Sequence, residues 1–315
     1  MKLSYLAPFL WGELRRKARE NAKQGVPLDI LVDFGFKSLF TANNEDSREA
    51  LRHLLSACIG RPVTVLSIQN NELLPEFLTG KTVRLDIHIR FNNGELADLE
   101  MQVQRTDDNI KVRSVFLAAR MLSGQAKRGK SYKQIRRVYQ IFFLDFILFS
   151  ESDKVPRRYF MQEEEEHDQL SDVVSSIFYE LPKLKKVARE CLSGKRDVSV
   201  LSADQKWGIF FKYRNVKKMA ALIGELCQKE EGIMKADRAL KKISHDEEHW
   251  ARSLFREKMA MDYRSGISNA YDKGLEDGAE KARLALEEKD RILGEKDRAI
   301  AELNRKLLEA GKDTY

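Results

Sequence analysis

Cysteine is scarce in this sequence, and its spacing excludes the two structures in which cysteines most often matter. Three cysteines occur in 315 residues, at Cys58, Cys191 and Cys227. They are odd in number, lie far apart and form no Cys-x-x-Cys pair, which argues against a disulfide framework and against a cysteine zinc site. A reducing cytoplasm is therefore the compartment that we expect for this chain.

A long uninterrupted apolar segment is also missing. Residues 1–20 contain a short apolar stretch, but charged residues follow from Glu13 onward. That stretch is shorter than the roughly 20 apolar residues that a membrane helix needs, and no small-residue cleavage signal follows it. The apolar run of residues 141–149 is interrupted by Asp145 and predicts a buried strand. We therefore expect no membrane partner.

Charge, by contrast, is abundant and unequal in sign. Charged residues make up 33% of the chain, and 56 lysines and arginines face 49 aspartates and glutamates, which gives a formal net charge of +7. A basic balance of this size fits a nucleic-acid partner, although many soluble proteins share it. The composition is thus compatible with DNA binding without establishing it.

The hydrophobic pattern divides the chain into four expected parts. Residues 1–28 predict an amphipathic lead-in. Residues 29–185 alternate helix-like and strand-like segments, which predicts an α/β domain with a mixed central sheet flanked by helices. From Ser171 onward the pattern is mostly that of helices, so residues 186–265 predict a helical region and residues 266–315 a charged helical tail.

The most informative segment is a predicted β-hairpin. VRLDIHIR and ELADLEMQVQ both alternate apolar and polar residues, and FNNG lies between them. A two-residue loop would pair Asp86 with Met101, whereas a three-residue loop with Gly94 in the left-handed conformation pairs Asp86 with Glu100. Only the second register separates apolar from polar side chains, so we predict it. The polar face then carries Arg84, Asp86, His88, Asp98, Glu100 and Gln102.

Two acids side by side on neighbouring strands can hold a divalent cation. Directly opposed residues have Cβ atoms about 5 Å apart, so Asp86 and Glu100 can share Mg²⁺ (or Mn²⁺), which accepts one or two carboxylates plus waters and a substrate phosphate. Such an ion neutralises phosphate charge and makes water nucleophilic. Gln102 can orient that water or a phosphate oxygen, and Arg84 can contact the phosphate. The alternative interpretation is an ordinary solvated face of an antiparallel sheet.

The order of the motifs resembles that of one bacterial family. DFGFKSLF, RLDIHIR, ADLEMQVQ, a basic helix, VYQIFFLDF and FYELPKL follow one another over residues 29–185, and GLEDGAEKA lies in the tail. This order is similar to that of the PD-(D/E)XK recombination-promoting nucleases, which are also described as transposase-like. The resemblance implies a restriction-endonuclease-like fold and metal-dependent endonuclease activity on DNA that promotes recombination.

The resemblance also implies roles for individual residues. It makes Asp86, Glu100 and Gln102 the active site, with the two acids as metal ligands. Asp33 belongs to the family's opening motif and is a further candidate catalytic acid, although it can equally be a plain helix cap. Gln102 stands where the wider superfamily usually has lysine, so a positive charge beside the nucleophile is missing. A catalytically weak DNA-binding or assembly module with the nuclease fold is therefore the alternative function.

A basic helix over residues 109–129 is expected beside the hairpin. Its buried side is predicted to carry Val112, Val115, Phe116, Ala119 and Leu122. Lys37 matches the opening motif of the family, and Arg113 matches a basic position on this helix. The residues that we expect to contact DNA are Lys37, Arg84, Arg113, Arg120, Lys127 and Arg128.

The tail contains a heptad repeat. Leu286, Leu293, Ile300 and Leu307 lie seven residues apart, and their companion seam positions are Lys289, Lys296, Leu303 and Ala310. Two lysines in the seam predict weak pairing. The tail is thus either a coiled coil that forms a homo-oligomer or a solvated single helix.

Overall fold

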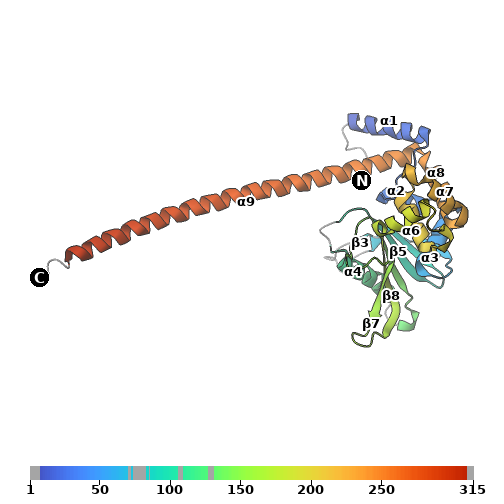
Figure 1. Cartoon of the computed structure of the whole chain (residues 1–315), viewed down its shortest axis with the longest axis horizontal. Helices are drawn as coiled ribbons and strands as arrows, with labels where there is room; N and C mark the ends of the chain where they lie inside the picture. The colour runs from blue at the N-terminus through green and yellow to red at the C-terminus, as the bar shows by residue number, and fades with distance from the viewer. Residues whose placement is uncertain are drawn as a thin grey trace. The chain divides into compact units, whose positions relative to one another are not determined.

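The chain separates into two compact units, Met1–Phe255 and Arg256–Tyr315, shown in Figure 1. This division does not show which of the four parts expected from the sequence folds by itself. The expected boundaries at residues 28, 185 and 265 therefore stay predictions. The computed structural model describes residues 8–69, 72–73, 83–84, 86–105, 109–126 and 131–310.

Three helices precede the sheet: α1 (Pro8–Gln24), α2 (Asp33–Thr41) and α3 (Glu45–Ile59). The side chain of Asn44 caps α3 by accepting a hydrogen bond from the backbone of Ser47, and Gly60 ends the helix in the left-handed conformation. Helix α2 needs glycine at position 35, because a Cβ atom there would lie 2.0 Å from the carbonyl oxygen of Asp29. This close approach fixes α2 against the preceding loop.

The central sheet is mixed, as the sequence predicted. Its strands follow the order β1-β4-β5-β6-β8-β7; β5 pairs in parallel with β6 and β6 with β8, while the other pairs are antiparallel. The bounds are β1 (Val65–Ile68), β4 (Ile87–Phe91), β5 (Glu95–Gln102), β6 (Val138–Leu144), β7 (Arg157–Gln162) and β8 (Gln169–Glu180), and a separate pair is formed by β2 (Glu72–Leu73) and β3 (Val83–Arg84).

The predicted three-residue hairpin register is confirmed. Phe91 pairs with Glu95 and Ile87 with Leu99. Gly94 takes the left-handed conformation with a φ of 92°. Continuing this register by one residue brings Asp86, which immediately precedes β4, opposite Glu100.

Two hydrophobic cores cover the two faces of the sheet. On one face, Ile87, Leu99 and Phe143 pack with side chains of α2, α3, α6 (Ala203–Tyr213) and α8 (Glu231–Ser244), including Phe36 and Phe211. The other face packs beneath α4 (Ile110–Ser123), whose Ile110, Leu117 and Met121 meet Leu96, Phe142 and Phe178. Glu100 belongs to this second face, so α4 covers the predicted site.

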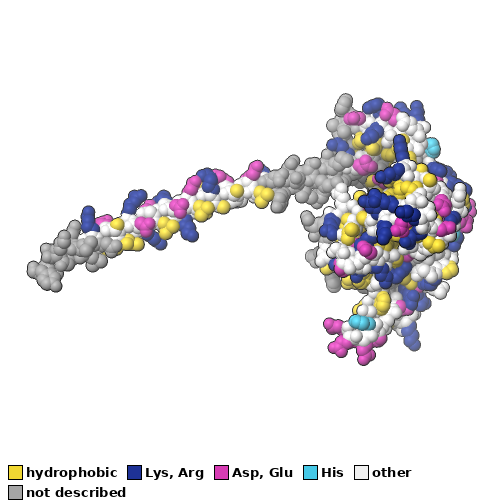
Figure 2. All heavy atoms as spheres, viewed as in Figure 1, with side chains coloured by type: hydrophobic (Ala, Val, Ile, Leu, Met, Phe, Trp, Pro, Cys, Tyr) yellow, Lys and Arg dark blue, Asp and Glu magenta, His cyan; other side chains and the backbone are white. Residues whose placement is uncertain are grey.

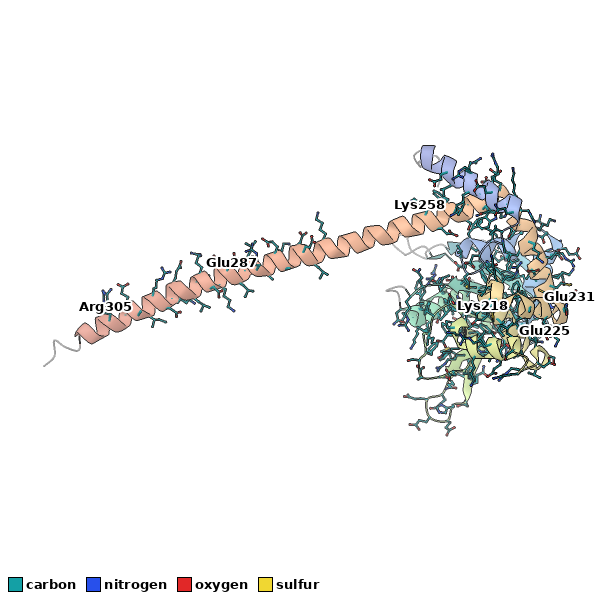
Figure 3. The ribbon with its side chains drawn as sticks, turned by 45° about the horizontal axis from the view of Figure 1, so that its top comes forward. Lys218, Glu225, Glu231, Lys258, Glu287 and Arg305 are labelled. Carbon is teal, nitrogen blue, oxygen red and sulfur yellow. The ribbon has the colours of Figure 1, made fainter. Side chains whose placement is uncertain are left out.

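The helical part of the chain follows β8. Its long helices are α5 (Lys185–Leu192), α6 (Ala203–Tyr213), α7 (Ala220–Lys229), α8 (Glu231–Ser244) and α9 (Glu247–Ala310), and its 3-10 helices are η3 (Leu181–Leu184), η4 (Val198–Val200) and η5 (Lys217–Met219); η2 (Tyr132–Gln134) lies before β6. Figure 3 shows Glu287 and Arg305 projecting from α9. No helix in the described part of the chain combines the length and hydropathy of a membrane span.

Two expectations were wrong. Residues 169–180 form β8, whereas the pattern predicted mostly helix from Ser171 onward. The inner half of β8, residues 176–180, is buried on both faces between β6 and β7, so it lacks the alternation that marks a half-exposed strand.

The buried face of α4 was also predicted wrongly. Val112, Val115 and Phe116 are exposed, at 62%, 67% and 46% of their surface, whereas Ser114 and Leu117 are buried. Apolar residues occupy more than one side of this helix, so periodicity alone allows two orientations. The orientation that the fold adopts is the one that brings Arg113 onto Glu100.

Candidate active site

Asp86 and Glu100 lie next to each other in the hairpin, and each side chain accepts a hydrogen bond from the backbone of the opposite segment. The backbone N–H of Asp86 donates to Glu100 Oε1 over 3.2 Å, and the backbone N–H of Met101 donates to Asp86 Oδ2 over 3.2 Å. Gln102 Nε2 lies 3.4 Å from Glu100 Oε2. The expected proximity of the three side chains is therefore confirmed.

Each of the two acids forms an ion pair with a cation from a different helix. Lys37 Nζ, on α2, lies 2.9 Å from Asp86 Oδ1. Arg113, on α4, donates to Glu100 Oε2 over 2.9 Å. The sequence predicted both cations as DNA contacts, and the structure brings them onto the carboxylates. They couple the two helices to the hairpin.

A buried polar pair next to Glu100 was not predicted. Gln140 Nε2 of β6 donates to Asp98 Oδ2 over 2.6 Å, and both side chains are fully buried. Burial raises the pKa of Asp98 to about 7, although the hydrogen bond from Gln140 lowers it. Two signals could have identified the pair: Asp98 precedes Glu100 by two residues on the same strand face, and Gln140 interrupts an apolar strand.

Glu100 is a carboxyl group that retains its proton unusually strongly. Burial raises its pKa well above the usual range, and the charges of Asp98 and Asp86 raise it further, while Arg113 lowers it. Three acids thus share a largely buried site, in which their negative charges repel one another. A bound cation would relieve this repulsion.

The donor set fits a hard divalent cation. Within the described residues, no group of three or more His, Cys, Asp or Glu side chains is arranged to hold a metal. Mg²⁺ does not need such a group, because it commonly binds one or two carboxylates and completes its shell with waters and substrate phosphate. Asp86 and Glu100 supply carboxylate oxygens of this kind, and Mn²⁺ accepts the same ligands.

The remaining candidate residues are only partly placed. Helix α2 begins at Asp33 with Val32 at the cap position, so Asp33 is not the N-cap; its side chain lies outside the described residues. The same holds for the side chain of Arg84, and Lys127 and Arg128 lie wholly outside the described residues.

Arg120 lies away from the acids. It lines a cavity of about 480 Å³ together with Gly94 and Leu96, at the hairpin-turn end of β5. Seven residues separate it from Arg113, which corresponds to about 10 Å along a helix. Arg120 is therefore displaced from the cleft that we expected it to border.

Fold and site together define the class of protein. A mixed α/β sheet that presents paired acids at the end of a hairpin is the restriction-endonuclease-like arrangement. A family model described as PD-(D/E)XK nuclease family transposase matches residues 30–270, which is most of the chain. This chain therefore belongs to the PD-(D/E)XK nuclease family transposases. Neither the curated proteins nor the solved structures yielded a match to it.

The raised pKa values predict a pH-dependent stability. Asp98 and Glu100 keep protons in the folded protein at a pH where the unfolded chain, with pKa values of about 4, has lost them. Without divalent metal, the contribution of these two groups to the free energy of unfolding should therefore be greatest near pH 4 and fall as the pH rises toward about 7.

Asp98→Asn should remove much of this fall in the free energy of unfolding with rising pH. The amide oxygen still accepts from Gln140 but carries no charge. In thermal unfolding with EDTA, we expect the variant to exceed the wild type at pH 8 by at least about 1 kcal/mol, or about 2–4 °C in Tm. At about pH 4 the two should be similar. An equal difference at both pH values would contradict the assignment of a raised pKa.

Proposed function

We propose that this chain is an endonuclease that hydrolyses DNA in the presence of Mg²⁺ or Mn²⁺ and promotes recombination or the movement of a mobile element. The observation that carries the proposal is the pair of hydrogen bonds that holds the two acids side by side at the end of the hairpin, one from the backbone of Asp86 to Glu100 and one from the backbone of Met101 to Asp86. Membership in a nuclease family supports the reaction class. In this proposal the two acids are the metal ligands.

The chain's own residues divide the remaining tasks. The bound cation supplies charge neutralisation and a nucleophilic water. Gln102, whose amide lies 3.4 Å from Glu100, orients that water or a phosphate oxygen. Arg113 holds the buried carboxylate of Glu100 in position.

Lys37 supplies the positive charge that Gln102 cannot. Its ammonium lies 2.9 Å from Asp86 Oδ1, which puts a cation beside the site from α2 rather than from β5. A cation next to developing negative charge stabilises the transition state most when it is fixed in a partly buried site. We therefore assign Lys37 to charge stabilisation rather than to general DNA contact.

The second candidate function is a DNA-binding or assembly module that retains the nuclease fold. The two ion pairs favour it, because Lys37 and Arg113 already neutralise part of the acidic charge without a metal. Metal-dependent cleavage separates the candidates, since a binding module would retard DNA on a gel and leave it intact.

Asp86→Ala tests the metal-ligand assignment. Cleavage of DNA in magnesium should fall at least about a hundredfold, which corresponds to the loss of a few kcal/mol of transition-state stabilisation. Because only 14% of this side chain is exposed and it accepts a backbone hydrogen bond, thermal unfolding must show that the variant is folded. Asp168→Ala, the same change in an exposed loop, should cut like the wild type. Wild-type cleavage by Asp86→Ala would refute the site.

Lys37→Met tests the source of the missing positive charge. The value of kcat should fall about tenfold to a thousandfold, as for the loss of one charge-stabilising donor, while KM for DNA changes little. Lys37→Arg should recover part of the rate. A raised KM with unchanged kcat would instead make Lys37 an ordinary DNA contact, as the sequence suggested.

We further propose that the tail forms a weak homodimer. On α9, Leu286, Leu293, Ile300 and Leu303 are exposed, and Figure 2 shows hydrophobic side chains among charged ones along the helix. Arg291 pairs with Glu288 and Glu295 on the opposite side, which stabilises the helix and leaves the seam open. The side chains of Leu307 and Ala310 lie outside the described residues.

Replacing the seam lysines should strengthen the dimer. Lys289→Leu with Lys296→Leu removes two charges from the core of the pair, so sedimentation should show a dissociation constant at least about tenfold lower. Lys281→Leu, outside the seam, should have little effect. Leu293→Lys with Ile300→Lys should leave monomers. A tight dimer that survives this last change would place the interface elsewhere.

A further inference from the structure

The edge of the sheet that carries the acids continues toward a group of cations on α5. Because β5, β6 and β8 are parallel, their carboxyl ends meet at one edge, where Gln102 pairs with Leu144 and Leu144 with Glu180. The segments that follow these strands therefore lie along this edge. The first begins beside the acids, and the last leads into η3 and α5.

The loop between β6 and β7 joins the two ends of this edge. The backbone N–H of Asp145 donates to the carbonyl oxygen of Gln102 over 2.8 Å. Farther along, Glu180 Oε1 accepts from the backbone N–H groups of Leu148 and Phe149 over 2.6 and 2.8 Å. Arg105, which follows β5, donates to the carbonyl oxygen of Ile147. The loop is thus bonded to the segments on both sides of it.

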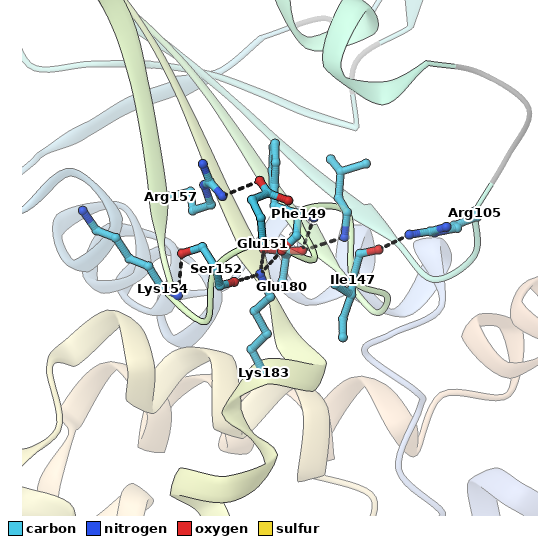
Figure 4. Close-up of polar contacts among 10 residues, drawn as sticks. Arg105, Ile147, Phe149, Glu151, Ser152, Lys154, Arg157, Glu180 and Lys183 are labelled. Carbon is cyan, nitrogen blue, oxygen red and sulfur yellow. Dashed lines mark hydrogen bonds and ion pairs between the residues drawn. The ribbon is translucent and has the colours of Figure 1, made fainter. Parts of the chain in front are cut away.

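A buried ion pair fixes the conformation of this loop. Lys183 Nζ lies 2.5 Å from Glu180 Oε2 and also donates to the carbonyl oxygen of Phe149 over 2.6 Å. Figure 4 shows Lys183 reaching up to Glu180 and the loop, with Arg105 at the other end of the loop. Both side chains of the pair are almost fully buried, so Lys183 stabilises the loop and is not available to bind a ligand.

Beside this loop, a pocket of about 510 Å³ is lined by exposed cations. Ile147 borders it on the loop side, and its cations with no ion pair among the described residues are Lys185, Lys186, Arg189 and Lys195. Of the two acids in the lining, Glu190 is bound to Arg196 over 2.8 Å, which leaves Asp153. The pocket therefore carries a clear excess of positive charge.

Folding alone does not account for this cluster. Lys185 and Lys186 occupy the first turn of α5, where the helix dipole disfavours positive charge. Lys185 and Arg189 are like charges one turn apart, an arrangement that destabilises a helix. Cations that are unfavourable for the helix are favourable for an anion bound in the pocket.

We propose that this pocket binds backbone phosphates of the DNA strand that enters the active site. Two strand spacings separate β5 from β8, which is about 10 Å. Each strand of DNA advances about 3.4 Å per nucleotide along the helix axis, so a pocket that lies beyond β8 meets phosphates at least about three nucleotides from the cut. Arg105, which follows β5, donates to the carbonyl oxygen of Ile147, a residue that lines the pocket. The contacts are to phosphate and do not depend on base sequence.

This inference rests on the proposed nuclease function, and the test separates the two. The full-length variant Lys185→Gln/Lys186→Gln/Arg189→Gln is compared with the wild type for binding a labelled DNA duplex of about 20 base pairs in EDTA, where no cleavage occurs. Affinity should fall at least about tenfold at physiological salt, and the log–log salt slope should flatten by about 0.9 for each phosphate that the variant no longer neutralises. A matched control, Lys17→Gln/Lys23→Gln/Lys242→Gln, removes the same charge from α1 and α8 and should leave both quantities nearly unchanged.

Ethylation of single phosphates locates the contact. In the wild type, ethyl groups at least about three nucleotides from the cut should interfere with binding, and this interference should disappear in the pocket variant. An unchanged slope and interference pattern in the variant, or an equal loss in the control, overturns the pocket while cleavage at Asp86 stands. Absence of cleavage by the wild type in magnesium or manganese overturns the proposed function instead.

Discussion

The pairing of Asp86 with Glu100 depends on the conformation of a three-residue turn. Asn92 and Gly94 both adopt positive φ angles, which closes the loop so that Phe91 meets Glu95. Side chains alternate along a strand, so a slip of one residue would move Glu100 to the opposite face of the sheet, which packs against α2 and α3, and Met101 to the site. The hydrogen bonds that join the two acids, and the cations that reach them from α2 and α4, all require this register.

Burial shapes the chemistry of these acids. Asp98 and Glu100 have no exposed surface, and an unpaired carboxylate in such surroundings is strongly disfavoured. Gln140 and Arg113 compensate part of this penalty, and raised pKa values reflect the rest. The apo site is thus held under electrostatic strain that a divalent cation would relieve. In the proposed metal site, folding and metal binding would be coupled through the same few carboxyl groups.

The parts of the site that could be predicted from the sequence are those set by local rules. Asn-Asn-Gly and strict alternation determine the hairpin, so the neighbours Asp86, Glu100 and Gln102 followed from a few residues. The orientation of α4 did not follow, because Val112 and Leu117 lie on different apolar sides and only contact with the sheet selects one. Strand β8 was missed for a similar reason, since the inner half of this strand is buried on both faces and shows no alternation of buried and exposed residues to identify it.

The positions of the cations determine which of them remain to attract DNA. Lys37 and Arg113 are bound to carboxylates at 2.9 Å, so much of their charge is neutralised within the protein and little remains to attract a phosphate at a distance. Arg120 lies at the far end of β5. A net charge of +7 must therefore act through other residues if the chain binds DNA electrostatically. The cations of α5 that line the pocket lie on the same sheet edge as the acids, so in our proposal they attract the DNA strand without competing for Asp86 and Glu100, the proposed metal ligands.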